Sequence, residues 1–297
     1  MQTTSNWRAN LLLFITAMIW GFSFVAQRQG MEHVSPFTFN AVRFAFGAAS
    51  LIPVILFNRK KQRSTTTPQV LFSKATINGG LCLGVVLFTG SSLQQIGIVE
   101  TTAGKAGFIT GLYVIIVPLL GLLWKQKTGR GTWFGAILAV IGMYFLSVTN
   151  DFTISKGDSL VLVSALFWAI HVQLVPLFLR KSNALHLSLY QFFFCSLFSW
   201  LAAIQWETIT ISGIQGGMWP ILYTGLLSVG IAYTLQIIAQ QKAHPAHAAI
   251  ILSLEAVFAV LGGYIILNET ISMRGMFGCG LMLAGMLLSQ LLKSKEA

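Results

Sequence analysis

The stretches LQQIGIVETTAGKAGFITGLY (residues 93–113) and LQIIAQQKAHPAHAAIILSLE (residues 235–255) align with each other without a gap. The alignment places Gln94 on Gln236 and Tyr113 on Glu255. Similarity between two distant parts of one chain is the signature of an internal repeat, and it decides which architectures fit the sequence. The chain is therefore predicted to consist of two related halves.

The repeat extends over most of each half. AMIWGFSFVAQ (17–27) matches ALFWAIHVQLV (165–175), which places Trp20 on Trp168. In the next apolar run Arg43 falls on Gln191. Because order and spacing persist, residues 1–150 and 151–297 are predicted to be the first and the second copy of one unit.

The composition places the chain in a lipid bilayer. Of its 297 residues, 55% are hydrophobic and only 9% are charged, and the mean hydropathy is +0.74. Soluble domains carry about 25% charged residues, so this chain has too little charge to cover a water-facing surface. A membrane-spanning helix needs about 20 mostly apolar residues. We expect an all-α polytopic membrane protein with ten spans at 10–28, 36–57, 75–98, 104–124, 131–149, 158–179, 186–206, 217–240, 246–267 and 274–292.

Five spans in each half predict that the two copies have opposite orientations in the membrane, because an odd number of crossings reverses the side on which the second copy begins. We therefore expect two inverted five-helix repeats around a central cavity. Such repeats are common in secondary transporters, whose solute sites lie near the bilayer midplane at the repeat interface. If the two copies exchange conformations, the cavity opens to each side in turn, which is alternating access.

The basic residues predict the orientation of the chain. The formal net charge is +11, and most Lys and Arg residues fall in the connections on the side of the two termini, including the RKKQR cluster (59–63). Cytoplasmic connections of membrane proteins carry such an excess. Both termini are therefore expected in the cytoplasm. The RKKQR cluster is interpreted as a topology anchor, and no nucleic-acid partner is expected.

Five stretches share the motifs of a known family: WGFSFVAQ (20–27), SPFTFNAVRF (35–44), TGLYVIIVPLLG (110–121), SLEAVFAVLGGYIILNE (253–269) and GLMLAGMLL (280–288). Together they resemble the EamA-type transporters of the drug/metabolite transporter superfamily. The fourth stretch is the most specific, although the family commonly has Pro where Ala256 stands and Gly where Asn268 stands. The resemblance implies ten helices around a central cavity, cytoplasmic termini, and transport of small organic solutes, amino-acid export included.

Aromatic and polar residues near the span centres form the candidate solute site. Aromatic residues of membrane helices usually lie at the interfaces with water, so central ones indicate either a cavity lining or packing between helices. His171 is also a candidate proton carrier. The residues predicted to line the cavity are Trp20, Gln94, Tyr113, Trp168, His171, Tyr233, Gln236 and Glu255. Trp20 and Trp168 are expected to approach each other across it.

Glu255 and Arg43 place charges inside the spans. A carboxylate in the middle of a span costs at least ~2.5 kcal/mol. Three roles are open for Glu255: a neutral buried acid, a structural tie to Arg43 or to a helix end, or a group that binds solute or protons. Arg43 is predicted to have a gating or structural role, with a solute carboxylate as its alternative partner.

The remaining side chains predict neither a metal site nor a cofactor. The three cysteines lie far apart in different apolar runs. His244 and His247 are interpreted as part of a connection that leads into a helix, and Lys105 is expected at the surface. Small residues recur at the spacing of close helix contacts in two runs: Gly131, Gly135, Ala139 and Gly142 in the fifth, and Gly280 and Ala284 in the tenth.

These features favour a secondary active transporter of small organic metabolites. The first choice is an amino-acid or metabolite exporter in the bacterial cytoplasmic (inner) membrane. No G-x-x-x-x-G-K-[ST] motif for nucleotide binding occurs, so the energy is expected from a gradient or from the solute itself, with protons as a candidate coupling ion. An importer, or a facilitative uniporter or channel for a small amphipathic or cationic solute, is the alternative. No enzyme motif is found. The expected partners are a solute and the bilayer; the sequence leaves the solute and the oligomeric state open.

Overall fold

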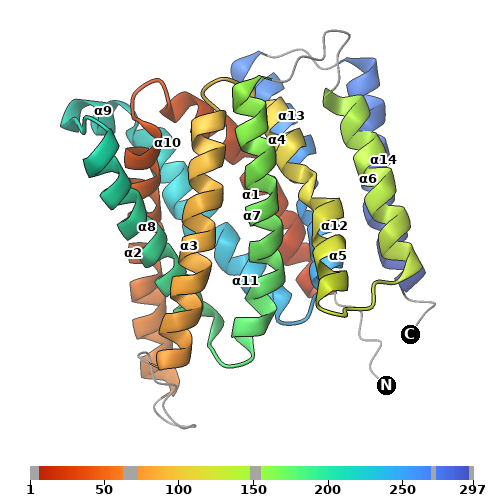
Figure 1. Ribbon diagram of the computed structural model, residues 1–297, viewed down its shortest axis with the longest axis horizontal. Coiled ribbons are helices and arrows are strands. Elements are labelled where there is room, and N and C mark those ends of the chain that lie inside the picture. The colour runs from red at the N-terminus through yellow and green to blue at the C-terminus, as the bar shows by residue number, and fades with distance from the viewer. Residues whose placement is uncertain (1–6, 63–72, 148–154, 269–271, 294–297) are drawn as a thin grey trace.

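The structure is a computed structural model that describes residues 7–62, 73–147, 155–268 and 272–293 (Figure 1). All regular elements within these ranges are helices. The first helix, α1 (Trp7–Gly30), begins at the same end of the bundle at which the last helix, α14 (Met273–Lys293), ends (Figure 1). Arg63 of the basic cluster, Glu269 and most of the connection 150–157 lie outside the described residues.

Eight segments of the described chain are long and apolar enough to cross a membrane. Five of them are single helices: α1 (Trp7–Gly30), α2 (Pro36–Gln62), α3 (Lys74–Gly97), α7 (Lys156–Leu179) and α8 (Ala184–Trp206). The other three are divided into α4 (Ala103–Gly111) with α5 (Tyr113–Leu123), α10 (Met218–Leu222) with η1 (Tyr223–Tyr233) and α11 (Thr234–Gln240), and α12 (Pro245–Leu252) with α13 (Glu255–Leu267).

The other two predicted runs also form helices, α6 (Arg130–Ser147) and α14 (Met273–Lys293). Their apolar parts, Arg130–Phe145 and Met273–Leu288, are shorter than the eight candidate spans. A short helix, α9 (Ile211–Gly216), precedes α10. The expected all-helical, polytopic membrane architecture is thus confirmed for the described residues.

Two spans are interrupted near their middles, at positions that the repeat relates. The Leu112 N–H donates to the Ile109 carbonyl (3.2 Å), and the Leu254 N–H donates to the Ile251 carbonyl (3.2 Å). These bonds span three residues and replace the α-helical pattern locally. Tyr113 begins α5 after one break, and Glu255 begins α13 after the other. The two residues that align in the repeat therefore occupy the same structural position.

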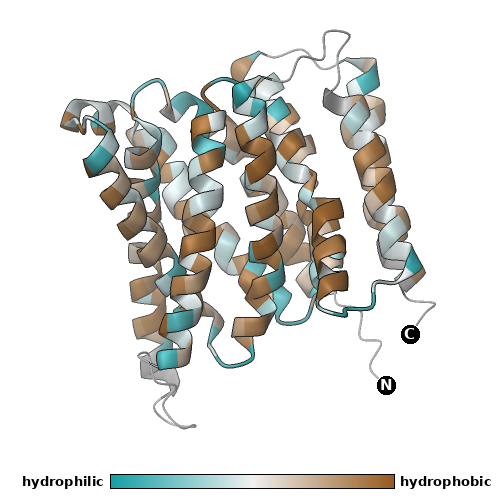
Figure 2. Ribbon diagram, in the orientation of Figure 1, coloured by the Kyte–Doolittle hydropathy of each residue, from teal (hydrophilic) through white to brown (hydrophobic). Residues whose placement is uncertain are grey.

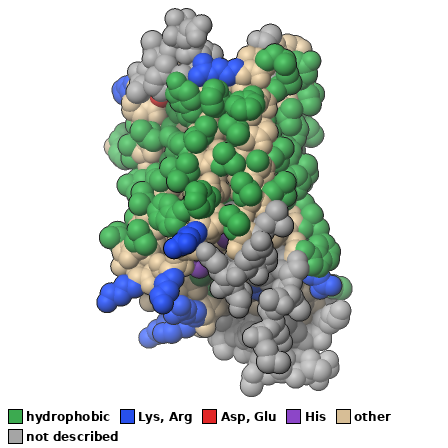
Figure 3. Space-filling model, turned by 90° about the vertical axis from the view of Figure 1, so that its right-hand side faces the viewer, with side chains coloured by type: hydrophobic (Ala, Val, Ile, Leu, Met, Phe, Trp, Pro, Cys, Tyr) green, Lys and Arg blue, Asp and Glu red, His purple; other side chains and the backbone are tan. Residues whose placement is uncertain are grey.

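Hydrophobic side chains cover the outside of the bundle. Figure 2 shows hydrophobic residues along the middle of most helices and hydrophilic ones toward the ends. On the face formed by α6 and α14, Phe134 and Phe277 are exposed by 63% and 58%, and Lys and Arg gather at the two ends of that face (Figure 3). An apolar belt with charged ends is the surface expected of a protein in a bilayer.

Glycines permit the closest helix contacts. On α6, a Cβ at Gly142 would lie 2.6 Å from the carbonyl oxygen of Gly278 on α14, as the expected small-residue contact requires. The same expectation is wrong for Gly280, because no atom of another helix in the described part of the chain lies within 4 Å of a Cβ built there. Where α1 crosses α13, a Cβ at Gly21 would lie 2.2 Å from Cβ of Phe258. This crossing holds Glu255 at the centre of the bundle.

We predict that Gly21→Ala destabilises the protein, whereas Gly280→Ala does not. The methyl group at position 21 meets the α13 backbone and costs roughly 1–3 kcal/mol as an overpacked contact. At position 280 the methyl group meets no neighbour, and alanine favours the helix by roughly 0.5–1 kcal/mol. Melting temperatures of the purified variants in detergent measure the difference. Equal melting temperatures would contradict the tight α1–α13 crossing.

Candidate functional site

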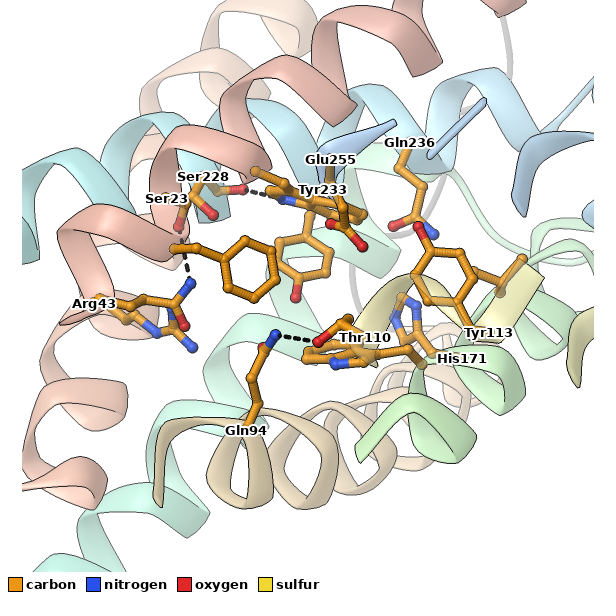
Figure 4. A pocket seen from close by; sticks show the side chains of 15 residues that line it. Ser23, Arg43, Gln94, Thr110, Tyr113, His171, Ser228, Tyr233, Gln236 and Glu255 are labelled. Carbon is orange, nitrogen blue, oxygen red and sulfur yellow. Dashed lines mark hydrogen bonds between the residues drawn. The ribbon is translucent and has the colours of Figure 1, made fainter. Parts of the chain in front are cut away.

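A small central cavity lies where the broken spans meet the other helices (Figure 4). The space in which the centre of a water molecule can lie has a volume of about 40 Å³. All eight residues predicted to line a cavity do line it, together with Arg43. The six other lining residues were not predicted from the sequence; they are Ser23, Phe24, Gln27, Thr110, Val172 and Ser228. Most of these are small or apolar and carry no signal of their own.

Tyr233 is the shared neighbour of the aromatic residues. Its ring centroid lies 4.6 Å from that of Trp20 and 6.2 Å from that of Trp168. The two tryptophans, expected to approach each other, thus each contact Tyr233. Tyr233 ends η1, a π-helical segment whose wider turns differ from the α-helices around it. Such segments are rare and often lie at functional sites. This π-helical segment was not predicted from the sequence.

Glu255 begins α13 and is only 3% exposed. The positive end of the helix dipole lies there, which stabilises a negative charge. The Tyr113 hydroxyl is directed toward the Glu255 carboxyl group (Figure 4). The two groups do not have hydrogen-bond geometry, and neither Tyr113 Oη nor Glu255 Oε1 has a hydrogen-bond partner among the described residues. Glu255 therefore lies at the cavity wall beside Tyr113, with its Oε1 atom free of a hydrogen-bond partner among the described residues.

Arg43 is buried in α2, with its guanidinium group 5.5 Å from the ring centroid of Phe39 and 5.1 Å from that of Phe44. Aromatic faces attract a cation at these distances. Arg43 Nε has no hydrogen-bond partner among the described residues. The ion pair found in the described part of the chain joins Lys105 and Asp158, so Arg43 and Glu255 do not form the structural tie considered for them.

Amide side chains link the cavity wall to its surroundings. Gln94 Nε2 donates to Thr110 Oγ1 (3.1 Å), and Gln236 Nε2 donates to Gln240 Oε1 (3.0 Å). His171 Nε2 lies 2.9 Å from Oε1 of Gln191, the residue that aligns with Arg43. His171 is therefore hydrogen-bonded at one ring nitrogen while its ring faces Tyr233 at a centroid distance of 6.1 Å.

Comparison with known proteins agrees with this architecture. The model of the EamA-like transporter family matches residues 7–148 and again residues 155–291. The chain belongs to the EamA-like transporter family. This assignment places it in the drug/metabolite transporter superfamily and confirms the resemblance drawn from the sequence motifs.

Relatives of this EamA protein occur in archaea, bacteria and plants. It is 32% identical to an uncharacterized transporter of Archaeoglobus fulgidus, over 95% of this chain and 86% of the relative. It is 23% identical to a WAT1-related protein of Arabidopsis thaliana, over 97% of this chain and 92% of the relative. A solved crystal structure of a protein that is 19% identical in sequence superposes on this protein with a TM-score of 0.77. The superposition covers 97% of this chain and 98% of the other chain. That similarity shows the fold.

We predict that Trp20→Ala and Trp168→Ala weaken solute binding more than they weaken folding, because both rings line the cavity. Trp219→Ala is the matched control, since Trp219 is 74% exposed on the outside of the bundle. The measurement is the melting temperature of each variant with and without members of a panel of amino acids and other metabolites. If a solute stabilises all three variants equally, both cavity tryptophans are packing residues.

Proposed function

We propose that this EamA protein is a secondary transporter that works by alternating access of two inverted five-helix repeats, residues 1–150 and 151–297. The family model matches once in each half. The helix contacts are reciprocal as well: α1 packs on α13 as α7 packs on α4 and α5, and α2 packs on η1 as α3 packs on α8. In addition, α6 packs along α14. This pattern supports a bundle of ten helices in which α6 and α14 are the fifth and the tenth.

Unpartnered polar atoms around one cavity carry this proposal. A buried polar group without a partner costs about 1–3 kcal/mol, and a charged group costs more. A protein gains from such groups only if another molecule satisfies them. The cavity-lining atoms without a hydrogen-bond partner among the described residues are Gln27 Oε1, Arg43 Nε, Tyr113 Oη, Trp168 Nε1, Gln236 Oε1 and Glu255 Oε1.

The same groups favour a small amphipathic solute, with amino acids as the first choice. The Arg43 guanidinium group suits a carboxylate. The Glu255 carboxyl group suits an ammonium group, or exchanges a proton when the cavity opens. The rings of Trp20, Trp168 and Tyr233 provide an apolar surface between polar groups. Tyr113 and the glutamines add hydrogen-bonding groups. In this proposal Arg43 either contacts the solute or takes part in opening and closing the cavity.

Export from the cytoplasm is the proposed direction, with both termini in the cytoplasm of a bacterial cell and the chain in its inner membrane. The described termini lie at one end of the bundle, which is the end where the connections carry most of the Lys and Arg residues. The positive-inside rule assigns that end to the cytoplasm. No nucleotide-binding motif occurs in the sequence, so a gradient supplies the energy.

The proposal is tested by Glu255→Gln. The variant keeps size and most hydrogen bonding, so we expect it to fold, but it lacks the carboxylate that binds an ammonium group or a proton. Counterflow of the most stabilising amino acid in proteoliposomes should fall roughly ten-fold or more, the effect of losing about 1.4 kcal/mol. Its pH dependence between about 5 and 8 should also flatten.

Glu32→Gln is the control, because Glu32 is an exposed acid away from the cavity. The experiment requires that the wild-type protein shows counterflow, because a channel does not produce counterflow. Wild-type counterflow and an unchanged pH profile in Glu255→Gln would show that this acid takes no part in transport.

A further inference from the structure

Asp158 joins α7 to α4 and to the connection between α3 and α4. Its carboxylate accepts from Lys105 Nζ (2.6 Å), from Thr101 Oγ1 (2.8 Å) and from the Ser155 backbone N–H (2.7 Å). The Asp158 side chain is 4% exposed and that of Lys105 is 25% exposed. Lys105, expected at the surface, is therefore half-buried in an ion pair that ties the two repeats together.

A second contact joins the repeats at the opposite end, where the chain termini lie. Nε2 of His247, in α12, lies 3.1 Å from Oδ1 of Asn10, in α1. His247 is 5% exposed. This contact therefore also links an element of one half to an element of the other. Unlike the first, it does not join a fixed cation to a carboxylate.

The repeat relates the two contacts to each other. In the alignment of residues 93–113 with 235–255, Lys105 falls on His247. Each is the third residue of its half-helix, α4 or α12. The alignment of α1 with α7, continued toward their first turns, places Asn10 on Asp158. The two contacts therefore occupy equivalent positions. One consists of Lys and Asp at one end of the bundle, and the other consists of His and Asn at the opposite end.

The helix crossings beside the two contacts also differ, with glycines at the end that has the ion pair and alanines at the other end. Beside Lys105 and Asp158, a Cβ at Gly97 would lie 2.6 Å from the carbonyl oxygen of Gly157, so the two backbones are in direct contact. The equivalent positions at the other end are Ala239 and Ala9, both buried. Alanine methyl groups keep backbones farther apart than glycines do. The glycines beside the ion pair therefore permit a backbone approach that alanines at the equivalent positions do not.

We infer that Lys105–Asp158 and Asn10–His247 are the two gate contacts of the transport pathway, and that the ion pair makes the Lys105 end the more firmly closed. The inference rests on the proposed alternating access. Charge-assisted hydrogen bonds are roughly twice as strong as neutral ones, and a half-buried pair is screened less than an exposed one. The resting protein therefore opens more readily at the Asn10 end. In the proposed topology that end faces the cytoplasm, where an exporter takes up its solute.

The test exchanges the two gates and measures from which side the cavity is reached. Lys105→His with Asp158→Asn gives the first end the residues of the second. Asn10→Asp with His247→Lys does the reverse. The reporter is Ser228→Cys, at a cavity-lining position, in a background in which Cys82, Cys195 and Cys279 are replaced. A small charged thiol reagent is added to vesicles of either orientation, and the labelling rate is measured.

We expect the unexchanged protein to be labelled faster from the Asn10 end. Lys105→His/Asp158→Asn should raise the rate from the Lys105 end roughly five-fold or more and lower the rate from the other end. Asn10→Asp/His247→Lys should lower the rate from the Asn10 end. Lys156→Gln, which removes an exposed charge beside Asp158, should change neither rate. The single variant Asp158→Asn replaces the first double variant if that one does not fold.

Two negative outcomes have different meanings. If the labelling rates of the reporter depend on the side of addition but neither exchange shifts them, the gate assignment is wrong and the transporter proposal stands. If the reporter is labelled equally from both sides in every variant, alternating access is wrong, and the gate assignment is overturned with it.

Discussion

The crossing of the two broken spans is the constraint on which the rest of this structure depends. Backbone groups in the hydrocarbon region of a bilayer require partners within the protein. The breaks at Leu112 and at Ser253–Leu254 loosen the α-helical pattern in the middle of two spans, so they are stable only when surrounded by protein. Packing of α4 on α13 and of α5 on α12 places both breaks at the centre. The cavity, with Tyr113 and Glu255 at its wall, follows from this arrangement.

In the proposed repeat, the residues that differ between equivalent positions carry the chemistry. Equivalent positions hold Arg43 and Gln191, Tyr113 and Glu255, or Lys105 and His247. In each pair, one copy has lost or gained a charge. A cavity between two identical copies would treat its two ends alike. Arg43 and Glu255, the charged members of the first two pairs, give the cavity one guanidinium group and one acid, and we infer that Lys105 makes the two gates unequal in strength.

Much of this could be predicted from the sequence, because span length and apolar composition reflect the bilayer directly. The candidate cavity residues were found from their central positions, and all of them lie around one cavity. The breaks were not predicted, because no proline marks Leu112 or Ser253. The π-helical segment ending at Tyr233 carries no compositional signal. The partner of Lys105 could not be identified either, since it lies 53 residues away and only tertiary packing brings the two together.

We propose that one cavity opens alternately at the two ends of the bundle. Distances between pairs of spin labels measure this directly by pulsed electron paramagnetic resonance. One pair is placed at the exposed residues Val99 and Lys156, and the other at the exposed residues Arg8 and Lys242. The account predicts that a transported amino acid shifts the two distance distributions in opposite directions. Distances that lengthen together at both ends, or that do not respond to a solute that is transported, would contradict it.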